Sequence, residues 1–219
     1  MRILALDAAL ARCSAAVWAD GVVLAEQAAP GGRGHAALLA PMAGAVLAAA
    51  GLPATALDGV VVTVGPGSFT GLRAAIALAQ GIAAGAGVAV QGVTVAEALA
   101  EMAGPALDGR ALWVAIDSRR GRIFLDRDGT PVPTDLNALP RAEGRVAVAG
   151  DAAIEVAARL AARGSDVMLT DARLPLARHV AAVGARRLAG TLPPCPAQPL
   201  YVDPPEAKLP AGGLRPPPA

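Results

Sequence analysis

The feature that most constrains the fold is the stretch 60–73, in which a run of β-branched residues leads through a glycine-rich turn into a helical pattern. Residues 60–64 (VVVTV) have the length and the branched side chains of a buried strand. Gly65 and Gly67 allow backbone angles that a Cβ atom would forbid. The stretch therefore predicts a buried strand, a tight turn and a helix in direct succession, an arrangement typical of α/β folds.

The same turn has the shape of a phosphate cradle. Ser68 or Thr70 can cap the first turn of the helix, where unpaired amide groups form a natural anion site. However, the lysine of a P-loop and the GxGxxG order of a dinucleotide fold are both missing. One interpretation is a strand-to-helix corner without a ligand. The other is a nucleotide contact formed by Gly65, Gly67, Ser68, Thr70 and Gly71.

Residues 65–73 (GPGSFTGLR) resemble the signature of the TsaB (YeaZ) family, the accessory subunit of the bacterial machinery that makes tRNA threonylcarbamoyladenosine. The nine-residue motif is specific, whereas each flanking match is weak. The resemblance extends from the first strand to the last residues of the chain. The flanking matches, in the family's order, are ILALD at 3–7, Cys13 and Ser14, His35 with LLAP at 38–41, IDSRRG at 116–121, PLYV at 199–202, and Ala207 with Lys208.

The alternation of short apolar runs with helical patterns predicts an α/β fold with a mixed sheet. The family resemblance implies two tandem ribonuclease-H-like halves of the actin-like ATPase superfamily, which includes sugar kinases and chaperones. We expect an N-terminal half at 1–104, a degenerate C-terminal half at 105–192, and a proline-rich tail at 193–219 that forms an extended strap or a loose end. Strands are expected at 3–6, 14–19, 22–27, 60–64, 88–91, 111–117, 122–126, 146–149 and 167–169, and helices at 35–50, 70–84, 94–102, 152–163 and 176–188.

The charge balance and the cysteine count restrict the classes of function. A net charge of +1 provides no field that would attract a nucleic acid, so we expect any RNA contact to be shared with a partner. Two cysteines make neither a disulfide framework nor a metal cluster. The segments 36–57 and 74–96 carry no charge, but turn residues interrupt them, and we interpret neither as a membrane span. Because Asp7 falls where a signal peptide would be apolar, we expect a cytoplasmic protein.

The helices expected at 35–50 and 70–84 carry almost no charge on any face. A helix on the surface of a monomer normally presents a charged face to water. Either both helices are covered within the chain, or they form a partner surface on which small side chains allow close approach, and we favour the partner surface. The resemblance implies docking to the catalytic subunit TsaD or to a second copy. The expected docking residues are His35, Leu38, Leu39, Met42, Val46, Leu72, Arg73 and Ile76.

Few residues are candidates for catalysis or for metal binding, and we expect neither. Asp7 ends the first strand, where kinases and ATPases of the superfamily keep a catalytic carboxylate, but Ala8 and Ala9 follow it instead of hydroxyl residues. Asp7 is therefore either a turn residue or a nucleotide contact. The two histidines, His35 and His179, form no HxxxH pair that could hold a metal on one helix face.

A dense cluster of charges surrounds Gly121. It could clamp a phosphate or contact RNA, or it could be the solvated tip of a hairpin whose ions pair with nearby acids. The family tends to carry Glu directly after this glycine, so the arginine found there puts a role carried over from the family in doubt. The cluster consists of Asp117, Arg119, Arg120 and Arg122, and the nearby acids are Asp126 and Asp128.

The resemblance implies a non-catalytic partner subunit that supports TsaD while TsaD transfers a threonylcarbamoyl group to N6 of the adenosine beside the anticodon. TsaE would be a third, ATPase subunit, and tRNA would be contacted through the complex. We expect no cofactor, unless ATP or ADP binds at the subunit interface. The alternatives are an ATPase or acyltransferase that uses Asp7 and the 65–71 turn, a degenerate glycoprotease-like homologue, and a self-associating scaffold. Under the partner hypothesis, Leu39→Glu or Ile76→Glu abolishes association with TsaD and leaves a folded monomer.

Overall fold

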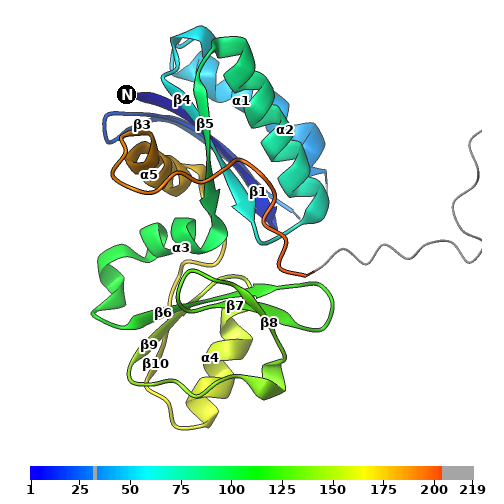
Figure 1. Ribbon diagram of the computed structural model, residues 1–219, viewed down its shortest axis with the longest axis vertical. Helices are drawn as coiled ribbons and strands as arrows, with labels where there is room; N and C mark the ends of the chain where they lie inside the picture. The colour runs from blue at the N-terminus through cyan, green and yellow to red at the C-terminus, as the bar shows by residue number, and fades with distance from the viewer. Residues whose placement is uncertain (32–33, 204–219) are drawn as a thin grey trace, which may run out of the picture.

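The computed structural model describes residues 1–31 and 34–203. These residues form two five-stranded sheets, one above the other in Figure 1, in the orders β3-β2-β1-β4-β5 and β10-β9-β6-β7-β8. The predicted α/β fold with mixed sheets is confirmed. The strands are β1 (Arg2–Leu10), β2 (Arg12–Ala19), β3 (Val22–Pro30), β4 (Gly59–Gly65), β5 (Ala89–Thr94), β6 (Ala111–Asp117), β7 (Ile123–Asp126), β8 (Val132–Thr134), β9 (Val146–Ala149) and β10 (Val167–Leu169). The helices are α1 (His35–Ala49), α2 (Phe69–Ala86), α3 (Val95–Ala103), α4 (Ala153–Ala162) and α5 (Ala177–Leu188), with short 3-10 turns at Ala54–Ala56, Gly104–Leu107 and Leu136–Ala138.

The first sheet is covered by helices on both faces (Figure 1). Its strand β1 pairs antiparallel with β2 and parallel with β4, and β4 pairs parallel with β5. Alternate residues of β1 belong to different core clusters, because successive side chains of a strand point to opposite faces. Leu4 and Leu6 pack with α1 and α2, whereas Ile3 and Ala5 pack with α5. Strand β4 is buried along its whole length, as the VVVTV run predicts.

The second sheet has its own core, and α3 lies between the two sheets (Figure 1). Strand β6 pairs antiparallel with β7 and parallel with β9, and α4 packs on β9 and β10. Val95 and Leu99 of α3 pack with Val114 and Ile116 of β6. The sequence did not predict β8, since Pro133 argues against a strand. Strand β8 is at the edge of the sheet, the position where proline is tolerated.

Helix α5 corrects the expected division of the chain at residue 104. We expected the helix at 176–188 to belong to the second half, but it packs on the first sheet, opposite α1 and α2. Its apolar face, which includes Ala177 and Val180, is buried against β1 and β4. A Cβ atom added to Gly184 would lie 2.2 Å from Cγ1 of Val61, so the helix approaches the strand very closely. The chain therefore returns to its first half after completing the second sheet.

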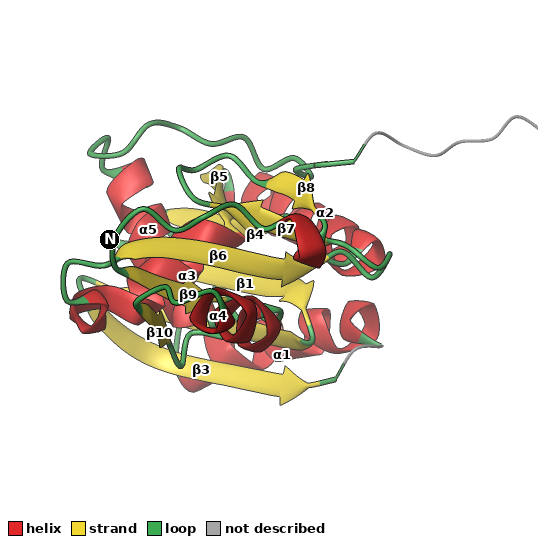
Figure 2. Cartoon of the chain, turned by 90° about the horizontal axis from the view of Figure 1, so that it is seen from below, coloured by secondary structure: helices red, strands yellow, loops and turns green. Residues whose placement is uncertain are grey.

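Residues 193–203 cross the β5 side of the first sheet as an extended strap, which both Figure 1 and Figure 2 show running from α5 toward the end of the described chain. The amide of Gly92 in β5 donates to the carbonyl of Cys195 at 2.7 Å, and the amide of Leu200 donates to the carbonyl of Val64 at 2.8 Å. The side-chain amide of Gln80 donates to the carbonyl of Ala197 at 2.9 Å. Of the two forms expected for the tail, these residues adopt the strap. Residues 204–219 lie outside the described part of the chain.

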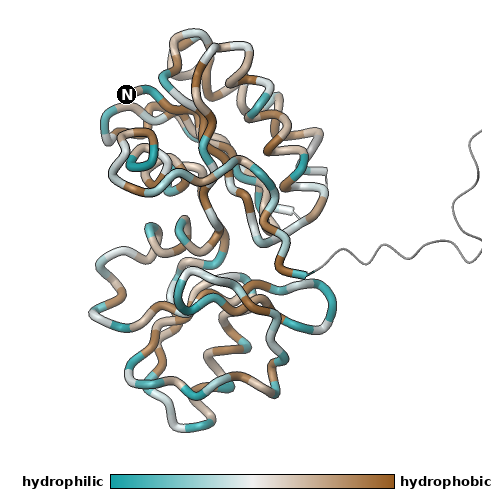
Figure 3. The backbone as a smooth tube through the Cα atoms, in the orientation of Figure 1, coloured by the Kyte–Doolittle hydropathy of each residue, from teal (hydrophilic) through white to brown (hydrophobic). Residues whose placement is uncertain are grey.

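Helix α2 is two residues longer at its C-terminus than expected and begins one residue earlier. In the described residues it is the one helix long and apolar enough to cross a membrane by length and composition. In the structure its inner face, with Leu72, Ala75 and Ala79, is buried in the fold. Figure 3 shows that hydrophilic positions are sparse along both α1 and α2.

Candidate functional site

The glycine turn between β4 and α2 is filled by the chain's own backbone. The amide of Ser68 donates to the carbonyl of Ala9 at 2.7 Å, and the Ser68 hydroxyl accepts from the amide of Gly71 at 3.2 Å. A Cβ atom added to Gly67 would lie 2.2 Å from the Ala9 oxygen, and one added to Gly71 would lie 2.2 Å from the Ala8 oxygen. The two glycines therefore make room for the backbone of residues 8–9. In the phosphate-cradle interpretation a ligand would have to occupy this space. This geometry favours the strand-to-helix corner.

The two other candidate nucleotide contacts in this turn do not alter that conclusion. Gly65 has a φ of 119°, and a Cβ atom there would lie 3.1 Å from Cδ1 of Leu72 and 3.2 Å from the carbonyl oxygen of Leu200, so its neighbours are α2 and the strap. Thr70 is exposed in the first turn of α2, where the capping oxygen comes from Ser68 instead. The glycine pattern that resembles a nucleotide-binding turn thus has a packing explanation at each position.

Asp7 is completely buried at the end of β1. Its Oδ1 accepts hydrogen bonds from the Thr63 hydroxyl at 2.6 Å and from the amide of Ala9 at 3.2 Å. Its Oδ2 has no hydrogen-bond partner among the described residues. Burial raises the pKa of Asp7 from its ordinary 3.8 to about 6, although both hydrogen bonds act in the opposite direction. Asp7 is therefore a buried turn residue, and no ligand can reach it without opening the corner.

Asp7→Asn is expected to remove a pH dependence of stability. Because the folded-state pKa lies above the unfolded value, wild-type Asp7 favours folding below pH 3.8, and this contribution is lost as the pH rises to about 6. Between pH 4.5 and pH 7.5 the contribution of Asp7 should lower the free energy of unfolding of the wild type by about 2 kcal/mol. The variant, which has no titrating group at this position, should not show this decrease. Urea unfolding of both proteins at the two pH values measures this difference. If the free energy of unfolding changed with pH equally in both proteins, the raised pKa of a buried Asp7 carboxyl would be contradicted.

Six of the eight expected docking residues lie in the chain's own core, which corrects the sequence-based prediction. Four of them, Leu39, Met42, Val46 and Ile76, pack between α1, α2 and the strands of the first sheet, because a stripe of large apolar side chains gains most by facing a sheet. Leu72 packs with α3 and β6, and His35 is buried at the start of α1. Because both positions are buried, Leu39→Glu and Ile76→Glu are expected to destabilise the fold and not to leave the folded monomer that the sequence-based prediction assumes. Leu38 and Arg73 are exposed. The six buried residues and their exposed fractions are His35 (5%), Leu39 (1%), Met42 (8%), Val46 (1%), Leu72 (3%) and Ile76 (5%).

The solvent side of α1 and α2, here called the outer face, consists almost entirely of small uncharged residues. Its one charged member among the described residues is Arg73. A Cβ atom added to Gly44, Gly81 or Gly85 would meet nothing within 4 Å, so packing within the chain does not require these glycines. Each weakens its helix by about 1 kcal/mol relative to alanine. The outer face is formed by Ala37, Leu38, Ala40, Pro41, Gly44, Ala48 and Ala49 of α1, and by Phe69, Thr70, Arg73, Ala77, Gln80, Gly81, Ala84 and Gly85 of α2.

The charge cluster around Gly121 forms the turn between β6 and β7, and its ions are paired. Arg119 lies 3.2 Å from Asp117 and 3.2 Å from Asp151, while Arg122 lies 3.3 Å from Asp203 of the strap. These partners differ from the expected acids Asp126 and Asp128, which belong to the following turn. The described residues contain no group of three or more His, Cys, Asp or Glu side chains placed to hold a metal ion.

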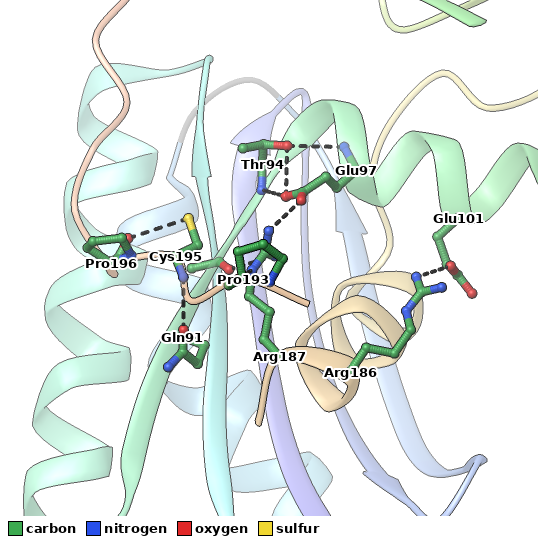
Figure 4. A network of polar contacts seen from close by, with 10 residues as sticks. Gln91, Thr94, Glu97, Glu101, Arg186, Arg187, Pro193, Cys195 and Pro196 are labelled. Carbon is green, nitrogen blue, oxygen red and sulfur yellow. Dashed lines mark hydrogen bonds and ion pairs between the residues drawn. The ribbon is translucent and has the colours of Figure 1, made fainter. Parts of the chain in front are cut away.

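The sequence reasoning missed a polar network beside the first sheet, where β5, α3, α5 and the strap meet, shown in Figure 4. Arg187 of α5 is almost fully buried, and its guanidinium donates to the carbonyls of Pro193 at 2.9 Å and Gly92 at 3.1 Å and also pairs with Glu97. Glu97 caps α3 together with Thr94 in a capping box. The TxxE spacing could have revealed the cap, but no local pattern links Arg187 to it. This network fixes α5, α3, β5 and the strap relative to one another.

A family model described as TsaD, tRNA N6-adenosine threonylcarbamoyltransferase, matches residues 22–167. The tRNA threonylcarbamoyladenosine biosynthesis protein TsaB of Escherichia coli (strain K12) is 38% identical over 125 residues, which are 57% of this chain and 53% of that protein. TsaB of Haemophilus influenzae is 32% identical over 129 residues, or 58% of this chain and 53% of that protein. The chain thus spans about half the length of these curated relatives.

Solved structures agree with the family model. A Pseudomonas aeruginosa protein described as similar to the peptidase YeaZ superposes with a TM-score of 0.76 at 25% identity, over 92% of this chain and 99% of that chain. YeaZ from the same organism gives a TM-score of 0.74 at 26% identity, over 91% and 99%. Component A of the Acidaminococcus fermentans (R)-2-hydroxyglutaryl-CoA dehydratase, at 11% identity and a TM-score of 0.52, shares only the fold. The chain therefore belongs to the family that the TsaD model describes and, within it, to the TsaB (YeaZ) proteins.

Proposed function

We propose that this protein acts in tRNA threonylcarbamoyladenosine biosynthesis as a non-catalytic subunit that docks a TsaD-type threonylcarbamoyltransferase through the outer face. The observation that carries the proposal is the outer face itself, an almost uncharged helix surface with three glycines that the chain does not need for its own packing. Small side chains and glycines allow the helices of a partner to approach closely, and a monomer gains nothing from them.

The geometry of the corner supports a non-catalytic role. Asp7 is inaccessible, and the amide of Ser68 at the start of α2 is occupied by the carbonyl of Ala9. The protein would thus act through its surface, and the corner would hold α2 in position. In this role TsaE would join as the ATPase subunit, tRNA would be reached through the complex, and ATP or ADP would be restricted to the subunit interface.

The decisive experiment is Gly81→Arg on the outer face. A side chain added at Gly81 meets open space, so the variant should fold like the wild type, but its bulk and charge should weaken binding to the TsaD-type subunit of the same organism at least tenfold. Sedimentation velocity and co-purification measure the association. The matched control is Ala158→Arg, at an exposed position on α4 of the second half. Loss of binding in the control, or unchanged binding in Gly81→Arg, would contradict docking through the outer face.

The same measurement separates a second copy from a TsaD-type partner. A homodimer that forms alone and persists when the TsaD-type subunit is added would favour the self-associating scaffold. A homodimer that TsaD replaces would show that both partners use one surface. We propose the second behaviour, since a single outer face is shared by α1 and α2.

A further inference from the structure

A preformed cluster of two aromatic rings and a guanidinium lies where the strap meets the start of α2. The ring centroids of Phe69 and Tyr201 are 6.3 Å apart, with an angle of 36° between the planes. The Arg73 guanidinium lies 3.8 Å from the Phe69 ring centroid and 5.8 Å from that of Tyr201. Its Nε donates to the Tyr201 hydroxyl at 2.9 Å. Each member thus restrains the others, which lowers the entropy that a partner must remove on binding.

The rings of Phe69 and Tyr201 are exposed, although aromatic residues are rare in this chain. Phe69 is 58% exposed and Tyr201 is 51% exposed. The chain contains five aromatic residues, and the other three, Trp18, Trp113 and Phe124, are buried or half-buried. Tyrosine and arginine are enriched among the residues that supply most of the binding energy of protein interfaces, and phenylalanine is enriched in interface surfaces. The cluster therefore has the composition of an interface anchor.

The cluster is continuous with the outer face, and it includes Arg73, the one charged residue of that face among the described residues. Phe69, Arg73, Ala77 and Gly81 follow one another at intervals of four residues and so lie along one side of α2. Within the described residues, the Arg73 side chain donates its hydrogen bond from Nε, and the first turn of α2 contains no acidic residue. The Nη groups are thus available to an incoming carboxylate, which complements the single positive charge of the outer face.

Contacts on both sides of Tyr201 hold the strap in place. Beside Tyr201, the amide of Leu200 is bonded to β4, and Asp203 pairs with Arg122 of the β6–β7 turn at 3.3 Å. The strap therefore brings Tyr201, near the end of the described chain, to the helix that begins at Phe69. Covering the edge of the first sheet does not require the exposed ring of Tyr201 at this position of the strap.

We propose that Phe69, Arg73 and Tyr201 anchor the docking surface, and that they receive an acidic side chain flanked by apolar groups from the TsaD-type subunit. This inference rests on the proposed function and adds the strap to the interface. The cluster supplies the binding energy, while the small residues of the outer face allow the helices to approach. The interface then depends on residues from two segments that are distant in the sequence.

The test compares dissociation constants for the TsaD-type subunit by calorimetry with the full chain. Phe69→Ala and Tyr201→Ala should each weaken binding at least tenfold with unchanged thermal midpoints, because both rings are exposed. Tyr201→Phe keeps the ring and should retain most of the affinity. Arg73→Gln should weaken binding and also reduce its dependence on salt, since it removes the charge. Val132→Ala, an exposed apolar residue of the second sheet, is the matched control and should bind like the wild type.

The outcomes distinguish the anchor from the proposed function. If Gly81→Arg abolishes the complex while the three anchor variants bind like the wild type, the anchor is overturned and docking through the outer face remains. If wild-type protein fails to bind the TsaD-type subunit, the proposed function and the anchor are overturned together. If the anchor variants keep their affinity for that subunit but lose affinity for tRNA in a filter-binding assay, the occupant is a nucleic acid and the anchor is overturned.

Discussion

Leu39→Glu is expected to unfold the protein rather than to release a partner from a folded monomer. Leu39 is 1% exposed and lies in the core between α1 and the first sheet. The substitution removes the apolar contacts of a buried leucine and introduces an unpaired carboxylate, a loss of more than about 4 kcal/mol. Since domains of this size are stable by about 5–15 kcal/mol, most of the stability would be lost. Circular dichroism and urea unfolding at pH 7.5 measure the effect.

The adjacent Leu38→Glu is the matched control, with the same change of residue type one position earlier. Leu38 is 45% exposed on the outer face, so its substitution should change the free energy of unfolding by less than about 0.5 kcal/mol. It should nevertheless weaken association with the TsaD-type subunit, because it places a charge on the docking surface. A folded Leu39→Glu variant with wild-type stability would show that α1 does not pack on the sheet in the way described.

Local patterns predicted most of the strands and helices of this fold. The VVVTV run, the turn after it and the helix that follows are specified by adjacent residues, and their bounds in the structure agree within two residues. Helix α3 was equally predictable, because its TxxE capping box lies within four residues. Strand β8 was not, since a proline that normally disfavours a strand is tolerated at a sheet edge.

The error at the docking helices has a specific physical cause. On α1 and α2 most of the large apolar side chains face inward, Leu38 and Phe69 excepted, and the outward positions are mostly alanine and glycine, but neither face carries the charges that usually mark solvent. The sequence therefore revealed that the helices lack a polar side without revealing which side was exposed. Burial alone settles the choice. The surface available to a partner is the side formed mostly by small residues, and the side that carries Leu39, Met42 and Val46 is buried.

Contacts between distant segments were beyond the reach of local patterns. The return of α5 to the first sheet depends on the close approach of Gly184 to Val61, and the strap depends on Arg187, which joins Gly92 to Pro193. No spacing rule relates residues so far apart in the sequence. The anchor cluster has the same origin, since Tyr201 reaches Phe69 only because the strap is held in place. The candidate site was thus predictable only in its helical part.

Gly71→Ala is the second substitution with a large expected effect, and it tests the corner. The added Cβ atom would lie 2.2 Å from the carbonyl oxygen of Ala8, and that oxygen belongs to the backbone of β1, which cannot rotate away as a side chain would. Either α2 or the end of β1 must move, at a cost of about 3 kcal/mol or more. Urea unfolding should show the loss directly.

Gly81→Ala in the same helix is the matched control, because its Cβ atom meets nothing within 4 Å. Alanine should stabilise α2 there by about 0.5–1 kcal/mol, so the two substitutions should change stability in opposite directions. The pair also discriminates between the two interpretations of the turn. A phosphate cradle keeps its glycines for a ligand, so in that case Gly71→Ala would reduce nucleotide affinity and leave the stability of the free protein nearly unchanged. In a strand-to-helix corner, Gly71 is required by the close approach of the Ala8 backbone, so Gly71→Ala must lower the stability of the free protein.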